Sequence, residues 1–225
     1  MFAKLKKFLR HDNTPSNHHD IALDLKRKGD LCVHEERFEQ AIEYYRQALG
    51  LSPKLYEVLI AIGFASYEKG SIDDAAQYLH QALSISPENA DVQFMLGNIA
   101  KTQGESQRAI EHYSHAIKSD PEFRFAYRAL FGIFQEQGDA QRAKEILDKA
   151  MLALPTDEYF IFERADFYFV AKDYQNTIRL FQKLLQLSPN NAAVHVNIAV
   201  SLMNLDQNEA AIHHFEQAAK LEPDD

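Results

Sequence analysis

Six prolines stand at equal intervals of 34 residues along this chain of 225 residues. They are Pro53, Pro87, Pro121, Pro155, Pro189 and Pro223, and a seventh proline, Pro15, lies outside the series. The equal intervals leave no insertion or deletion between one unit and the next, so the chain is an internal repeat. A period of this length indicates an elongated array of small units that pack on their neighbours rather than around one core.

Two helical patterns recur in every unit. When the positions of a unit are numbered 1 to 34 with the proline at position 32, apolar residues recur at helical spacing in both halves of the unit. We therefore predict an all-α solenoid of antiparallel helix pairs over residues 21–225, preceded by a basic amphipathic segment and a linker in residues 1–20. Its predicted repeats are residues 22–55, 56–89, 90–123, 124–157, 158–191 and 192–225.

The predicted connections between helices carry residues that are typical of turns. Position 15 is glycine in three units (Gly70, Gly104 and Gly138), and glycine readily adopts the left-handed conformation that ends a helix. A serine or aspartate precedes the proline in four units, and we expect its side chain to cap the following helix, with the proline in the first turn. These four residues are Ser52, Ser86, Asp120 and Ser188.

Small and large side chains recur at fixed positions of the unit. Position 8 is glycine in the first three units, positions 20 and 27 are mostly alanine, and position 24 is always large. Small residues let two helices approach closely, and large residues fill the space beside them. With the proline at position 32, this pattern resembles the tetratricopeptide repeat (TPR) family over residues 22–225. The resemblance implies a right-handed superhelical solenoid that acts as a non-enzymatic protein-binding scaffold.

Several residues depart from the pattern of the family. They are Gln93 and His195 at position 4, Phe131 at position 8 with Gly132 beside it, and Arg164, Thr177 and Leu184 in the fifth unit. The fifth unit also holds the densest group of aromatic residues, within residues 158–174. We expect this unit to contribute most to any interface, because aromatic side chains are typical anchors of binding energy.

The resemblance also implies which residues line a concave groove, namely positions 2, 5, 9 and 12 of each first helix. Many of these residues are aromatic or aliphatic here, and exposed apolar surface of this extent marks an interaction site. The candidate peptide-binding residues are Ile60, Phe64, Tyr67, Phe94, Asn98, Lys101, Phe125, Arg128, Tyr159, Phe162, Phe169 and Val196. The alternative is that these side chains only pack sideways between neighbouring first helices.

Two ligand classes of the family do not match this sequence. The clamp for a chaperone's C-terminal carboxylate needs lysine, arginine and asparagine at five positions. This chain offers Lys26, Asp30, Ala61, Asp91 and Met95 there. The asparagine ladder of sugar-transferase arrays, at position 6, is reduced to Asn197. We therefore expect neither a C-terminal carboxylate nor the ligand of an asparagine ladder.

Composition and charge exclude further classes of function. The formal net charge is −9, of which the first 20 residues carry +2 and the array −11, so the array repels nucleic acid. The single cysteine, Cys32, rules out an internal disulfide and is typical of the cytoplasm. We find no catalytic constellation, no metal-ligand spacing and no cofactor motif, and the histidine pairs are expected to be surface polar residues.

Both ends of the chain raise separate hypotheses. Residues 1–10, MFAKLKKFLR, would form a short basic amphipathic helix that contacts the inner membrane surface or fills the groove, or else a frayed terminus that adds solubility. At the other end, the family leads us to expect a polar seventh helix after the sixth unit. Its absence from the sequence suggests either a longer native chain or self-association through the uncovered sixth unit.

Three functions follow from these observations. The first is an adaptor that binds a peptide or helix of a protein partner in an apolar, aromatic-lined groove. The second is the targeting region of a larger enzyme, such as a glycosyltransferase or methyltransferase. The third is an assembly factor that self-associates.

Overall fold

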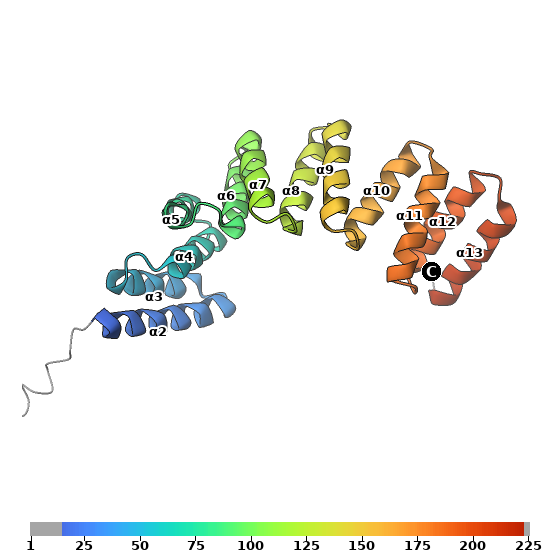
Figure 1. Cartoon of the computed structure of the whole chain (residues 1–225). Helices are drawn as coiled ribbons and strands as arrows, with labels where there is room; N and C mark the ends of the chain where they lie inside the picture. The colour runs from blue at the N-terminus through green and yellow to red at the C-terminus, as the bar shows by residue number, and fades with distance from the viewer. Residues whose placement is uncertain (1–14, 223–225) are drawn as a thin grey trace, which may run out of the picture. The chain divides into compact units, whose positions relative to one another are not determined.

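The computed structural model describes residues 15–222, which form twelve helices joined by short connections, without a strand (Figure 1). The predicted all-helical TPR fold is confirmed. The described residues divide into two compact units, of which the first ends at Asp120 and the second begins at Pro121. Neighbouring helices pack on one another in sequence order within each unit, as expected for a solenoid.

The N-terminal unit contains three helix pairs. Its helices are α2 (Pro15–His34), α3 (Phe38–Leu51), α4 (Tyr56–Glu68), α5 (Ile72–Ile85), α6 (Ala90–Thr102) and α7 (Ser106–Ser119). Helix α2 begins within the stretch that we expected to be a linker, so the first helix of the array is longer than the others. The predicted basic segment, residues 1–10, lies outside the described residues.

The C-terminal unit also contains three helix pairs. Its helices are α8 (Arg124–Glu136), α9 (Ala140–Ala153), α10 (Glu158–Val170), α11 (Tyr174–Leu187), α12 (Ala192–Met203) and α13 (Asn208–Leu221). None of the helices formed by residues 15–222 is both long enough and apolar enough to cross a bilayer.

The turn within each helix pair has the same backbone conformation in all six units. Position 15 has a positive φ at the three predicted glycines, with values from 68° to 87°. It also has a φ of 58° at Glu36, Lys172 and Asp206, which occupy the same position in the other units. The repeat geometry therefore imposes the left-handed conformation even where a side chain makes it unfavourable.

The expected capping role of the residues before the prolines is wrong. Ser52, Ser86, Asp120 and Ser188 each end the preceding helix, as its C-cap. The proline then lies in the turn, and the next helix begins three residues after it. Residues at position 34 cap that helix instead: Asn89 accepts from Val92 N, and Asn191 accepts from Val194 N. Two residues lie between each proline and the start of the next helix, and the second of them, at position 34, is the capping position.

Glycine at position 8 makes room for the large residue at position 24. A Cβ placed on Gly97 would lie 2.5 Å from the Tyr113 ring, and one on Gly63 would lie 2.8 Å from the Leu79 side chain. Both large residues are buried. The close approach of each helix pair therefore depends on the missing side chain, as the alternation of small and large residues predicts.

The two polar departures at position 4 are matched by histidines at position 23 of the same unit. Gln93 Oε1 lies 2.9 Å from His112 Nδ1, and His195 Nδ1 lies 2.9 Å from His214 Nδ1. Each pair joins the first helix of a unit to the second. A polar group inside a helix interface is costly without a partner, and the histidine at position 23 supplies that partner in both units.

The arginine at position 7 of the fifth unit is satisfied in a similar way. Arg164 is buried, and its Nε lies 2.8 Å from Asp148 Oδ1 on α9. Its guanidinium also stacks over the Tyr168 ring at 4.3 Å. A charged residue thus replaces the usual apolar residue and links the fourth and fifth units through an ion pair.

Candidate partner-binding faces

The twelve predicted binding residues are divided between the two units, and none of them is buried. Six lie on α4 and α6 of the N-terminal unit, and six lie on α8, α10 and α12 of the C-terminal unit. The exposed ones are Phe64, Lys101, Phe125, Arg128, Phe162 and Val196. The other six, Ile60, Tyr67, Phe94, Asn98, Tyr159 and Phe169, are half-buried.

In the N-terminal unit, part of the predicted set also serves packing. Ile60 and Tyr67 pack against the buried cluster around Leu59 and Leu96. Asn98 Oδ1 accepts a hydrogen bond of 2.8 Å from the buried Tyr113 hydroxyl. Phe64, by contrast, leaves 39% of its surface exposed on α4.

In the C-terminal unit, accessible aromatic rings lie on α8 and α10. Phe125 leaves 53% of its surface exposed, and Phe162 leaves 38% exposed. The Phe162 ring packs edge-on against Phe181, with centroids 5.4 Å apart, so it is held in place while one side stays accessible. The Arg128 guanidinium stacks over the Tyr159 ring at 4.3 Å. This cation–π contact joins α8 to α10.

Two acidic residues on α10 complete this surface and were missing from the predicted set. Glu163 and Asp166 lie one turn apart and alternate with the aromatic residues at helical spacing. We call the residues Tyr159, Phe162, Glu163, Asp166 and Phe169 the α10 stripe. The spacing of the carboxylates relative to the aromatics was visible in the sequence, but which of these side chains stay accessible was not.

The environment of Glu163 is unusual for an accessible carboxylate. Burial raises the pKa of Glu163, and the nearby charge of Asp166 raises it further. A hydrogen bond with Tyr159 and the Arg128 guanidinium partly offset this increase. Burial, followed by the charge of Glu163, likewise raises the pKa of the Tyr159 hydroxyl. The stripe therefore holds negative charge that is only partly solvated and partly neutralised.

Val196 lies at a different place, in a hollow on the sixth unit. The hollow has a volume of about 620 Å³ and is lined by α12 and α13, including Phe215, Ala218 and Ala219. Phe215 is 36% exposed there, whereas Phe181, at the same position of the fifth unit, is only 3% exposed. Helix α12 packs on α11, the helix that carries Phe181. This packing accounts for the lower exposure of Phe181.

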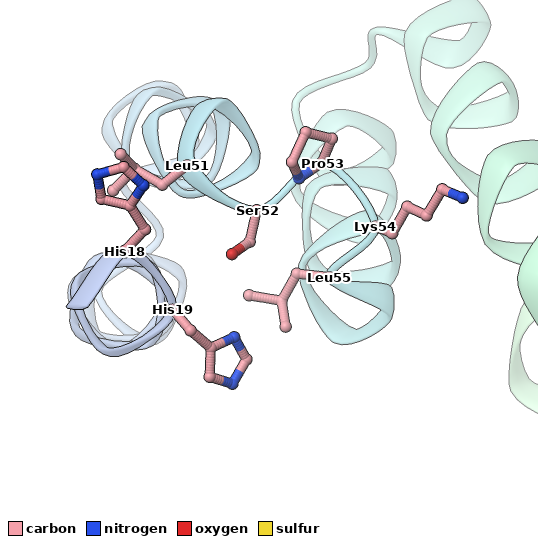
Figure 2. A pocket seen from close by; sticks show the side chains of 7 residues that line it. All are labelled: His18, His19, Leu51, Ser52, Pro53, Lys54 and Leu55. Atoms are coloured by element: carbon pink, nitrogen blue, oxygen red, sulfur yellow. The ribbon is translucent and has the colours of Figure 1, made fainter. Parts of the chain in front are cut away.

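A second hollow, at the start of the array, has no arrangement suited to chemistry. It lies between His18 and His19 of α2 and the connection from Leu51 to Leu55 (Figure 2). Leu55 and Ser52 point toward α2, while the Lys54 side chain points away from the hollow (Figure 2). Within residues 15–222 no three histidine, cysteine or acidic side chains are grouped closely enough to hold a metal ion.

The helix pairs, their turns and the matched small and large positions define a tetratricopeptide repeat array. Family models of this repeat match residues 27–55, 66–132 and 168–225, more than half of the chain. The chain therefore belongs to the tetratricopeptide repeat family. Such repeats are typically non-catalytic modules that bind proteins, so the chain is a protein-interaction scaffold in this general sense.

Particular relatives agree in fold but differ widely in sequence. The C-terminal part of a TPR protein from Cytophaga hutchinsonii is 19% identical, with a TM-score of 0.71 over 87% of this chain and 78% of that one. PilF of Pseudomonas aeruginosa is 18% identical, with a TM-score of 0.67 over 93% of this chain and 95% of that one. At such identities the similarity concerns the fold alone.

A curated relative matches only one part of the chain. The STIP1 homolog of Dictyostelium discoideum is 36% identical over 56 residues, which are 25% of this chain and 10% of that protein. The chain thus spans about a tenth of the length of this relative. The match supports the repeat assignment and is too short to transfer an activity.

Proposed function

We propose that the chain is a non-enzymatic adaptor whose first helices bind a peptide or a helix of a partner protein. The twelve predicted residues would make the contacts, with aromatic and aliphatic side chains as anchors and Lys101 and Arg128 as polar contacts. The observation that carries this proposal is the accessibility of Phe64, Phe125 and Phe162, three large rings on the first helices. Accessible aromatic side chains on a rigid element are typical binding anchors.

The proposal can be tested with a random dodecapeptide library displayed on phage and selected on the full chain. Peptides that the chain selects should bind the Phe125→Ala/Phe162→Ala variant at least about tenfold more weakly, because two central anchors are lost. Leu152→Ala is the matched control, since Leu152 is an exposed apolar residue on the second helix α9. A library that yields no binder, or binders that do not respond to the double substitution, would contradict the proposal.

The hollow on α12 and α13 favours a second function, self-association. Its mostly apolar lining and the exposure of Phe215 would suit the docking of another helix, and a second copy of the chain would cover it. Sedimentation velocity at several concentrations should then show a reversible dimer, which Val196→Gln/Phe215→Gln should convert to monomer. A chain that sediments as a monomer at every concentration would exclude this function.

The basic N-terminal segment supports a peripheral membrane contact from the cytoplasmic side. Its four cations and its apolar residues suit an anionic bilayer surface. The full chain should co-sediment with vesicles that contain phosphatidylserine but not with vesicles of phosphatidylcholine alone. Lys4→Gln/Lys6→Gln/Lys7→Gln should abolish this binding, and equal binding to both vesicles would contradict an electrostatic contact.

A further inference from the structure

Several carboxylates of the C-terminal unit form ion pairs, whereas those of the α10 stripe do not. Asp157 Oδ2 lies 3.2 Å from Arg124 Nη2 and forms an ion pair with it. Two further ion pairs join Asp139 to Arg142 and Asp148 to Arg164. Glu163 and Asp166, by contrast, have no ion-pair partner within 4 Å among residues 15–222. Two neighbouring carboxylates of one helix therefore lack a direct ion pair, although the Arg128 guanidinium partly offsets the charge of Glu163.

Accessible apolar side chains flank these carboxylates along α10. Phe162 lies immediately before Glu163 and is accessible, and Val170, one turn after Asp166, is among the most exposed apolar residues of the unit. A partner that covered the aromatic rings would also remove water from Glu163 and Asp166. Removing water from an ionised carboxylate is costly unless a cation replaces the water, so a neutral or acidic partner would bind poorly.

The chain itself shows that a cation is compatible with this surface. The Arg128 guanidinium of α8 already stacks over the Tyr159 ring. Beside it on α8, Gly132 carries no side chain, and a Cβ placed there would meet no atom within 4 Å. The neighbourhood of the α10 stripe therefore has room for a further long side chain and the electrostatic conditions for a positive one.

We infer that the α10 stripe selects a partner segment in which a lysine or arginine stands between apolar residues. This inference rests on the proposed adaptor function and specifies its ligand. The apolar side chains of the segment would cover Phe125 and Phe162, and its cation would lie against Glu163 and Asp166. Charge thereby contributes specificity, while the aromatic rings contribute most of the contact area.

The test compares selections from one random dodecapeptide phage library on three forms of the full chain. These are the unchanged chain, Glu163→Gln/Asp166→Asn, and the control Glu209→Gln/Glu216→Gln, which removes the same charge from exposed positions of α13. Peptides from the unchanged chain and the control should be enriched in lysine or arginine next to apolar residues. Peptides from Glu163→Gln/Asp166→Asn should keep the apolar residues and lose the cationic enrichment.

Affinity measurements on the selected peptides complete the test. By fluorescence anisotropy, the cationic peptides should bind Glu163→Gln/Asp166→Asn about tenfold or more weakly, because each substitution removes a charge partner from a partly desolvated surface. The affinity for the unchanged chain should fall as salt is added. Equal cationic enrichment on all three forms, or equal losses for the two double variants, would overturn the inference.

The outcomes separate this inference from the adaptor function. Peptides that depend on Phe125 and Phe162 but lack cations would refute the charge selection and leave the adaptor function supported. Peptides that depend on neither phenylalanine would refute both. Circular dichroism melting of each variant confirms that a loss of binding does not come from unfolding.

Discussion

At the scale of single residues, glycine has two different roles inside the helices. Gly97 stands against the Tyr113 ring, where an added Cβ would overlap the aromatic carbons. Gly132 lies in a helix as well, but space is open beside it. The same residue type is therefore required for packing at one position and is only a weak helix former at the other.

This contrast predicts opposite effects of one substitution. Gly97→Ala should lower the free energy of unfolding by about 1–3 kcal/mol, because Tyr113 cannot shift within a close-packed interior. Gly132→Ala should raise it by about 0.5–1 kcal/mol, because alanine favours the helix. Urea unfolding followed by circular dichroism measures both values. A stabilising Gly97→Ala would show that the interface between α6 and α7 is looser than the structure indicates.

Two buried serines give a second prediction at this scale. Ser66 Oγ has no hydrogen-bond partner in the described part of the chain, whereas Ser201 Oγ donates to Asn197 O at 2.8 Å. Ser66→Ala should therefore stabilise the protein by about 1 kcal/mol, because it removes an unsatisfied buried hydroxyl. Ser201→Ala, which removes a satisfied hydroxyl, should stabilise less or not at all. Equal thermal shifts for the two variants would contradict this account.

At the scale of the helix pair, the turn conformation belongs to the repeat and not to the residue that occupies it. Glycine occupies position 15 in three units, and glutamate, lysine and aspartate adopt the same left-handed conformation in the others. Packing between the paired helices fixes where the chain must turn. A residue that is unfavourable in this conformation therefore lowers the stability of the protein but does not change the turn.

The fixed turn conformation predicts that glycine at position 15 would stabilise the three units that carry another residue there. Lys172→Gly should raise the free energy of unfolding by about 1 kcal/mol, because it removes the strain of a side chain at positive φ. Gly138→Ala should lower it by a similar amount for the same reason. Thermal unfolding of the two variants tests the sign of each change. A destabilising Lys172→Gly would show that side-chain contacts of Lys172 outweigh its backbone strain.

At the scale of the whole molecule, two partly buried histidines couple stability to pH. Burial lowers the pKa of His112, and the charges of His80, Arg108 and His115 lower it further. Burial, followed by His195 and His213, lowers the pKa of His214. The unfolded chain therefore binds protons more readily than the folded chain at these sites, so they contribute less stability as the pH falls.

The predicted window begins near the unfolded histidine pKa of about 6.5 and extends down to the lowered folded pKa values. Stability should decrease as the pH falls through this window, as measured by urea unfolding at several pH values. His112→Gln should reduce the slope, because glutamine does not titrate and can still donate to Gln93. His34→Gln, at an exposed site on α2, is the matched control for replacing a histidine by glutamine. If the slope is unaltered in His112→Gln, then His112 does not contribute to the pH dependence of stability.

The sequence determined most of the architecture of this protein. The proline series and the repeated small and large positions predict a helix-turn-helix repeat, because helical spacing and turn residues are local properties. Gly70, Gly104 and Gly138 were recognised as turn residues for the same reason. The capping residues were misplaced, because the sequence does not show that two turn residues separate each proline from the following helix.

Only the tertiary structure decided how the unusual residues are used. Gln93 and His195 depart from the family at one position, and the structure pairs each with a histidine 19 residues further along the chain. It likewise shows that Phe162 stays accessible beside two carboxylates that form no ion pair with the described residues, while Asn98 accepts a hydrogen bond from Tyr113. Periodicity is encoded in neighbouring residues, but exposure and pairing depend on what the adjacent helices contribute, and that is defined only when the helices pack.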